Sequence, residues 1–401
     1  MSVRCFKRRS TEKLGVNQRI RVALVAPSLR ILGGQAVQAD RLLRAWRNDP
    51  DVDAWLVPVN PVAPLPFRRL LSLKYVRTLV TELTYIPLLL RELARADVVH
   101  VFSASYASFL LAPLPAVLIG RAFGRPVILN YRSGEAPDHL RRSSIARRTL
   151  ARVNSNVVPS SFLVDVFREF GVHARVIPNM VDLDRFRFKA RGPLRPRLVS
   201  TRNFHALYNV ACTIRAFRLV QDRWPDASLT LVGGGRQDGM LRQLVARLEL
   251  KNVVFVGQVR PDEIAGYYTA NDIYIQSPNI DNMPTSVIEA YASGLPVVST
   301  AAGGVPAILT SGEEGLLAPL DDHEALAAHV LDLLDDSALA ERLAGAAYAR
   351  CRACTWPSVR GQWLAAYREV LTRPEQSTSP HQSVGSESMP SPPTHRSAPT
   401  S

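Results

Sequence analysis

Short apolar runs and longer amphipathic stretches alternate twice along this chain. The first half has strand-like runs at residues 19–27, 52–59, 98–102, 126–130 and, more weakly, 156–158, and a helical pattern at 35–46. The second half has strand-like runs at 197–201, 228–232, 253–256, 273–276 and 296–299, and helical patterns at 209–223, 240–248 and 261–269. Continuous apolar strands separated by helices are typical of parallel sheets covered on both faces.

Two such sets in tandem predict an α/β fold with two Rossmann-like domains that face a cleft. A Pro- and Arg-rich segment, 189–196, is the expected linker. The predicted divisions are a basic flexible arm (1–18), a first domain (19–188), a second domain (189–355), a final helix (356–373) and a disordered Ser/Pro/Thr-rich tail (374–401).

The charge balance narrows the classes of partner. The net charge is +14, which would draw the protein toward phosphate-bearing ligands and anionic lipid surfaces. No helix-turn-helix, zinc-finger or aromatic–basic RNA pattern is present, so nucleic acid is not an expected partner. Arginines gather in the first domain and indicate either a solvated face or a surface for anionic lipid or a lipid-linked diphosphate: Arg121, Arg125, Arg141, Arg142, Arg147, Arg148 and Arg152.

The cellular compartment is predicted from cysteines and apolar segments. The chain has four cysteines, too few for a disulfide framework in a protein of this size. Cys351 and Cys354 have metal-site spacing, but no second Cys/His pair accompanies them. No apolar stretch is long enough to span a bilayer. We therefore expect a cytoplasmic protein without a metal site, in peripheral contact with the inner face of the membrane.

The segment with the most specific chemistry follows the fourth strand-like run of the second half. Asp281 and Glu289 lie eight positions apart, one in a loop and one on the helix that follows. Strand, polar loop and helix N-terminus together present free backbone N–H groups to an anion. Pro284 suits the first helical position, where no N–H is needed. A phosphate is therefore expected at residues 285–287, with Glu289 reaching a sugar hydroxyl.

Together with residues 292–300 and 303–306, this segment resembles the E-x7-E region of family-4 retaining glycosyltransferases, with Asp281 in place of the first Glu. The resemblance implies the GT-B fold, with the donor nucleotide held mainly by the second domain and the acceptor by the first. It implies a last helix that crosses back to the first domain. It also implies that Glu289 binds the ribose and that Asp281 lies near the transferred sugar. The loop contributes three further residues to the predicted nucleotide-sugar site: Met283, Pro284 and Thr285.

Arg202 follows a strand-like run, and an arginine at the carboxyl end of a parallel strand suits bidentate phosphate binding. In the family, an arginine at the matching position contacts the diphosphate. Members usually add a lysine several residues later, but residues 206–209 contain none. Arg215 and Arg236 are the candidates to replace its charge.

Glycine-rich turns supply the remaining candidate contacts. A glycine lets a ligand approach the backbone closely, although a plain tight turn has the same sequence. The resemblance implies that Gly33 and Gly34 approach the donor from the first domain. It implies that Gly233 and Gly234 face the nucleotide, and that backbone groups near Val259 hold the base.

Arg132 occupies a position where many family members have a histidine near the anomeric centre. An arginine can hold a sugar hydroxyl or an acceptor phosphate, but it cannot act as a base at neutral pH. Arg132, Arg202 and Asp281 are therefore the catalytic candidates. His100 alternates with apolar neighbours and is interpreted as a core histidine.

These observations predict a metal-independent retaining glycosyltransferase without a cofactor. It would move a sugar from a nucleotide-diphosphate sugar to a glycan or lipid-linked acceptor. Fixed cations and N–H groups can stabilise the departing diphosphate without a metal ion. Two alternatives stay open: a sugar-nucleotide epimerase of related fold, and a catalytically silent scaffold in a glycan-assembly complex.

Overall fold

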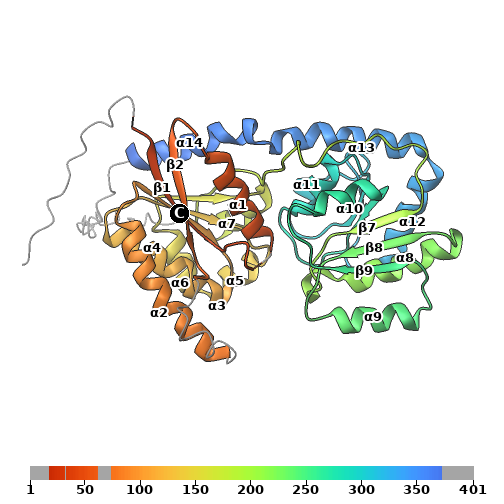
Figure 1. Cartoon of the computed structure of the whole chain (residues 1–401), viewed down its shortest axis with the longest axis horizontal. Helices are drawn as coiled ribbons and strands as arrows, with labels where there is room; N and C mark the ends of the chain where they lie inside the picture. Colours follow the sequence, from red (N-terminus) through yellow and green to blue (C-terminus); the bar gives the residue numbers. More distant parts are fainter. Residues whose placement is uncertain (1–17, 32, 62–73, 373–401) are drawn as a thin grey trace, which may run out of the picture.

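The computed structural model describes residues 18–31, 33–61 and 74–372. The predicted arm, apart from Gln18, and the predicted disordered tail lie outside these residues. Within them the chain forms two α/β halves, each built on its own parallel sheet (Figure 1).

The first half is built on a six-stranded parallel sheet in the order β2-β1-β3-β4-β5-β6. Its strands are β1 (Ile20–Ala26), β2 (Val52–Pro58), β3 (Val98–Ser103), β4 (Val127–Tyr131), β5 (Ser155–Val158) and β6 (Arg175–Val176). Its helices are α1 (Gly34–Trp46), α2 (Lys74–Leu93), α3 (Tyr106–Leu111), α4 (Pro113–Ala122), α5 (Ala136–Arg142), α6 (Ser144–Leu150) and α7 (Ser161–Glu169).

The second half repeats the plan with strand order β12-β11-β10-β7-β8-β9, again all parallel. Its strands are β7 (Arg197–Ser200), β8 (Ser228–Val232), β9 (Val253–Gly257), β10 (Ile273–Ile275), β11 (Val297–Thr300) and β12 (Leu316–Ala318). Its helices are α8 (Val210–Arg223), α9 (Asp238–Arg247), α10 (Ile264–Ala270), α11 (Thr285–Ala292), α12 (His323–Asp335) and α13 (Ser337–Cys351), with short 3-10 turns η2 (Ala206–Tyr208), η3 (Val305–Ala307) and η4 (Arg352–Cys354).

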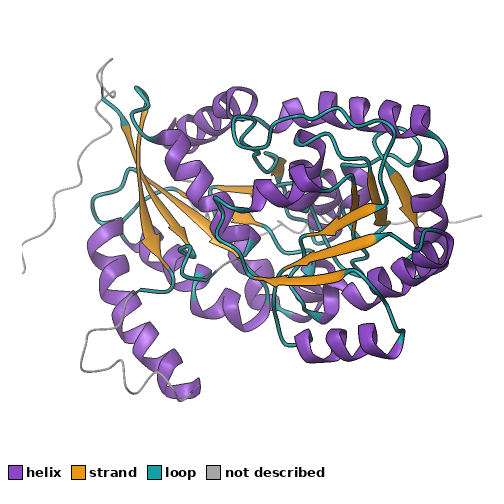
Figure 2. Ribbon diagram, turned by 45° about the vertical axis from the view of Figure 1, so that its right-hand side comes forward, coloured by secondary structure: helices purple, strands orange, loops and turns teal. Residues whose placement is uncertain are grey.

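Helices cover both faces of each sheet, as Figure 2 shows. The predicted fold class, an α/β protein with two Rossmann-like domains, is therefore confirmed. The inner strands carry β-branched and other apolar side chains that are almost fully buried on both faces, which is why their apolar runs are continuous, whereas the edge strands β2 and β9 are partly exposed. In such sheets ligands bind beyond the carboxyl ends of the strands. The strand ends therefore position the site.

The last helix, α14 (Trp356–Thr372), leaves the second half and packs on the first, in contact with β3 and β4 (Figure 1). Trp363 and Tyr367 are buried in the same apolar cluster as residues of β1 and β3. Arg360 forms ion pairs with Asp49 and Asp51 in the loop before β2, at 2.8 and 2.6 Å. The chain therefore passes between the halves twice, first after β6 and again before α14.

His100 on β3 is fully buried, as its interpretation as a core histidine requires. Its Nδ1 lies 2.9 Å from the Tyr367 hydroxyl, and its Nε2 lies 3.1 Å from Asn130 Nδ2. Burial, with a smaller effect of the charge on Arg132, lowers the pKa of His100 to about 3. The imidazole is therefore neutral in the folded protein at neutral pH.

This burial predicts an acid-sensitive first half. Between pH 6.5 and pH 3 the unfolded chain binds a proton at His100 that the folded chain does not, so stability falls as the pH falls. We expect this group alone to remove about 3 kcal/mol of unfolding free energy between pH 7 and pH 4. Urea unfolding of His100→Gln and of the parent at both pH values measures the difference. Equal losses in the two proteins would contradict the expectation.

Candidate functional site

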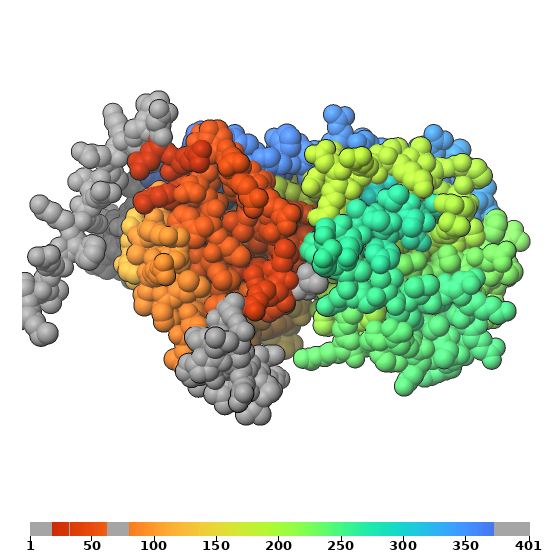
Figure 3. All heavy atoms as spheres, viewed as in Figure 1, coloured from red at the N-terminus to blue at the C-terminus, as the bar shows by residue number. Residues whose placement is uncertain are grey.

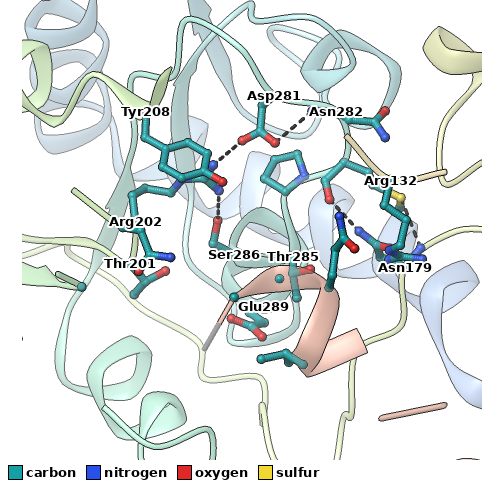
Figure 4. A pocket seen from close by; sticks show the side chains of 18 of the residues that line it. Arg132, Asn179, Thr201, Arg202, Tyr208, Asp281, Asn282, Thr285, Ser286 and Glu289 are labelled. Carbon is teal, nitrogen blue, oxygen red and sulfur yellow. Dashed lines mark hydrogen bonds and ion pairs between the residues drawn. The ribbon is translucent and has the colours of Figure 1, made fainter. Parts of the chain in front are cut away.

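A pocket of about 360 Å³ lies between the two halves, at the carboxyl ends of their strands. Figure 3 shows the two halves side by side, and Figure 4 shows the pocket side chains pointing toward one another. Every predicted site residue except Gly234 lines it. They are Gly33, Gly34, Arg132, Arg202, Gly233, Val259, Asp281, Met283, Pro284, Thr285 and Glu289.

Arg202 lies just beyond the end of β7 and is only 8% exposed. Its Nη2 lies 2.5 Å from Asp281 Oδ2, and its Nη1 donates to Ser286 Oγ at 3.1 Å (Figure 4). The guanidinium also lies 4.0 Å from the centre of the Tyr208 ring. Burial is the largest single effect and disfavours its charge, but the Asp281 carboxylate and nearby tyrosines together hold the pKa of Arg202 above its ordinary value. The strand end therefore carries a fixed positive charge in the pocket.

The loop before α11 joins this cation to the helix N-terminus. Asp281 Oδ1 accepts from the backbone N–H of Asn282 at 2.9 Å, which orients the carboxylate toward Arg202. The helix begins at Thr285, and Pro284 is its N-cap. The prediction that Pro284 is the first helical residue was therefore wrong by one position. Of the three N–H groups expected to bind a phosphate, that of Val287 donates to the Pro284 carbonyl at 3.2 Å. Those of Thr285 and Ser286 come before any acceptor within the helix, so they can receive an anion.

Glu289 is buried one turn into α11, at 6% exposure, and it has partners in both halves. Its Oε2 accepts from the Tyr268 hydroxyl at 2.9 Å, and its Oε1 lies 2.5 Å from Arg41 Nη2 of α1. A buried carboxylate needs such partners. Burial, followed by the Glu289 charge, raises the pKa of Tyr268 well above its ordinary value, so the phenol remains a donor.

The glycine turns frame the pocket from both sides. Gly33 and Gly34 begin α1, and a Cβ at either position would meet nothing within 4 Å. At Gly233 the backbone is left-handed, with φ of 156°, and a Cβ would lie 2.1 Å from the Arg202 carbonyl oxygen. Only glycine fits there, because the turn packs directly on the segment after β7. Gly234 does not line the pocket, because it packs behind Gln258, which does: a Cβ at Gly234 would lie 3.2 Å from Gln258 Cγ.

Arg132 directly follows the last residue of β4 and lines the pocket, where polar side chains hold it in place (Figure 4). Its Nη2 donates to Asn179 Oδ1, and its Nη1 donates to Asn130 Oδ1 at 3.3 Å. Asn179 in turn donates to the Met283 carbonyl at 2.6 Å. Burial lowers the pKa of Arg132 to about 9. A chain of hydrogen bonds therefore links the first half to the loop before α11.

Gly134, also from the first half, packs against that loop. A Cβ at Gly134 would lie 2.8 Å from the Asp281 carbonyl carbon. On the other side of the loop, a Cβ at Gly303 would lie 2.3 Å from the Asp281 carbonyl oxygen. A Cβ at Gly304 would lie 2.3 Å from the Asn282 carbonyl oxygen. The loop is thus enclosed by glycines of both halves.

Sequence reasoning missed Gln38, Arg41, Asn179 and Tyr268, which hold the predicted residues in place. Two polar residues three positions apart on the amphipathic helix pattern at 35–46 were the available signal for Gln38 and Arg41. Arg215 and Arg236, the candidates for the missing lysine charge, do not line the pocket.

No cluster of three or more His, Cys, Asp or Glu side chains able to hold a metal occurs in residues 18–31, 33–61 and 74–372. Over the same part of the chain, no helix is long and apolar enough to cross a membrane.

Two Rossmann-like halves with a cationic strand end and a helix N-terminus at their junction define a GT-B type of protein. Comparisons of sequence agree with this class. Residues 32–185 match the Glycosyltransferase Family 4 profile, and residues 185–350 match that of Glycosyl transferases group 1. The chain therefore belongs to the family-4 glycosyltransferases of the GT-B fold.

Curated relatives carry glycosyltransferase names. Phosphatidyl-myo-inositol mannosyltransferase of Mycobacterium tuberculosis (strain ATCC 25618 / H37Rv) is 26% identical over 379 residues, covering 88% of this chain and 97% of that protein. D-inositol 3-phosphate glycosyltransferase of Pseudarthrobacter chlorophenolicus is 28% identical over 309 residues, covering 70% of this chain and 72% of that one.

Solved structures share the fold. Anabaena Alr3699/HepE, in complex with UDP and glucose, has a TM-score of 0.68 at 16% identity and covers 87% of this chain and 100% of its own. Sucrose-phosphate synthase from Thermosynechococcus elongatus also has a TM-score of 0.68, at 20% identity, and covers 88% and 99%. At these identities the similarity shows the architecture alone.

Proposed function

We propose that this glycosyltransferase takes its sugar from a nucleotide-diphosphate sugar and keeps the anomeric configuration. The carrying observation is that a buried arginine, a helix N-terminus and a buried carboxylate line one pocket. Arg202 and the first N–H groups of α11 match a diphosphate, and Glu289 matches a ribose diol. Alr3699/HepE, which shares the fold, was solved with UDP and glucose. The base, the sugar and the acceptor are not specified by these groups.

In the proposed reaction the bond between the anomeric carbon and the diphosphate oxygen breaks, and its electron pair stays with the diphosphate. The acceptor hydroxyl oxygen bonds to the anomeric carbon, and its proton passes to the departing diphosphate. Arg202 and α11 stabilise the growing negative charge. Asp281 orients the sugar, and Arg132 holds a sugar hydroxyl or an acceptor phosphate from the first half. These roles need no cofactor.

The test is a thermal-shift screen with UDP, GDP, ADP and CDP and their sugars, since a ligand that binds only the native state raises its stability. We expect one nucleotide series to raise the melting temperature. Incubation of the best sugar nucleotide with envelope lipids or glycans should then yield a glycosylated product. No shift with any nucleotide would refute the proposal. Epimerised sugar nucleotide without acceptor would favour the epimerase, and donor binding without transfer would favour the scaffold.

Metal independence gives a separate prediction. Because Arg202 and the helix N-terminus supply the positive charge, transfer is expected to keep its full rate in excess EDTA. Added Mg²⁺ or Mn²⁺ should change the rate less than about 2-fold, since general ionic screening is the only effect left to them. A rate that disappears with EDTA and returns with one divalent cation would overturn this expectation.

The acceptor is proposed to bind the first half, at an anionic membrane surface on the cytoplasmic side. Exposed arginines and apolar side chains occur on α4, α5, α6 and the segments after them, the two kinds of side chain that such a surface would bind. They are Arg121, Arg141, Arg142, Arg148, Arg152, Leu118, Phe123 and Ile145.

Replacing Arg141, Arg142 and Arg148 together by glutamate is expected to weaken binding to phosphatidylglycerol vesicles about 100-fold or more, because each arginine contributes about 1 kcal/mol. Vesicle co-sedimentation measures this, with phosphatidylcholine as the neutral comparison. A matched control reverses three exposed charges of the second half: Arg215, Arg223 and Arg247. Equal losses in both triple variants would contradict a surface on the first half.

A further inference from the structure

Helix α1 of the first half reaches into the site that the second half provides for the nucleotide. Arg41 Nη2 lies 2.5 Å from Glu289 Oε1, and the two residues are 248 positions apart in sequence. The side chains are only 10% and 9% exposed, so solvent screens this ion pair weakly. The contact is therefore a buried bridge between the halves and not a surface pair.

Arg41 is itself held in place. Its Nη1 donates to the Met180 carbonyl at 2.7 Å, in the segment where the chain leaves the first half. Gln38, one turn earlier on α1, binds the same residue twice, donating to its carbonyl at 2.9 Å and accepting from its N–H at 2.8 Å. Gln38 also donates to Thr285 Oγ1 at 3.3 Å. The guanidinium is therefore fixed relative to both the crossing chain and α11.

The Glu289 carboxylate can accept further hydrogen bonds beside those from its two partners. An ionised carboxylate has about four acceptor positions, and Arg41 and Tyr268 each take one. Because one partner comes from each half, the carboxylate plane is fixed only while both halves are in place. Two acceptor positions remain, which matches two neighbouring hydroxyl groups of a ribose.

We propose that Arg41 is a positioning residue for the donor nucleotide, acting through Glu289. It orients the carboxylate and, as a cation from the first half, makes donor affinity depend on the approach of the two halves. This inference rests on the proposed function, since it takes Glu289 as the ribose-binding group. Arg41 adds positive charge to a pocket whose second half lacks the lysine expected at residues 206–209.

The test measures the affinity of the full chain for whichever of UDP, GDP, ADP or CDP gives the largest thermal shift. Arg41→Ala and Arg41→Gln are expected to weaken binding about 5- to 150-fold, the usual range for coupled sites. Arg41→Lys should recover part of the loss. KM for the sugar nucleotide should rise more than kcat falls. Arg44→Ala is the matched control. Arg44 lies on the same helix, its side chain is 64% exposed, and it forms an ion pair with Asp40 on that helix.

A double-mutant cycle separates positioning from general stability. If Arg41 acts through Glu289, Arg41→Ala combined with Glu289→Gln should be no worse than the more damaging single variant. Additive losses, or a lower melting temperature with unchanged affinity in Arg41→Ala, would overturn the inference. A loss confined to Glu289→Gln would also overturn it while the proposed function stands. Unchanged affinity in Glu289→Gln would refute the inference together with the ribose-binding role of Glu289, and the absence of any nucleotide binding would refute the proposed function itself.

Discussion

Replacing Arg202 by lysine is expected to lower kcat about 100- to 1000-fold, the usual cost of losing one preorganised group that stabilises transition-state charge. The guanidinium holds Asp281 and Ser286 on two of its nitrogens at once. A lysine ammonium is a single charge on a flexible stem and cannot reproduce that planar fork. The partly buried carboxylate of Asp281 would also lose its oriented partner.

Steady-state kinetics with the sugar nucleotide found in the screen measures this effect. Arg215→Lys is the control, because Arg215 is exposed on α8 and does not line the pocket. The control should keep the parent rate. If Arg202→Lys also keeps the parent rate, the guanidinium at the end of β7 does not stabilise the departing diphosphate.

Replacing Glu289 by glutamine is expected to raise the dissociation constant for the nucleotide about 30- to 1000-fold, since hydrogen bonds to a charged group contribute about 1.5–3 kcal/mol each. Glutamine keeps the shape of the side chain but not its charge. It also leaves the Arg41 guanidinium buried without a counter-charge, so stability should fall by up to about 3–5 kcal/mol.

Isothermal titration gives the affinity, and thermal melts without ligand give the stability. Glu263→Gln is the matched control, because Glu263 is exposed in the same half, before α10. A variant that melts lower but binds the nucleotide as the parent does would assign Glu289 to the fold alone.

Much of the fold could be predicted because its strands are buried on both faces. The apolar runs at β1, β3, β4, β8 and β11 were found within a residue or two of their ends. β6 and β12 were missed, and β6 has only two residues, too few to produce a pattern. Helix α2 was not predicted, and it carries Pro87 inside it, which in a sequence indicates a break.

The candidate site could be predicted where a local sequence creates the geometry. Arg202 follows a strand, and Glu289 lies on a helix entered from a polar loop, so short segments were enough to suggest them. The roles proposed for them remain predictions. The ion pairs that hold them could not be predicted, because no periodicity relates Arg41 to a residue 248 positions away or Arg202 to one 79 positions away. Such pairs exist only after both sheets have formed and met.

The hydrogen atom that serves as the side chain of residue 134 sets how closely the first half can approach the loop before α11. A methyl group there would lie 2.8 Å from the Asp281 carbonyl carbon, nearer than carbon atoms in real proteins pack. Any larger residue would act as a wedge. The fit of the two halves around the pocket thus depends on a missing carbon as much as on the charges around it.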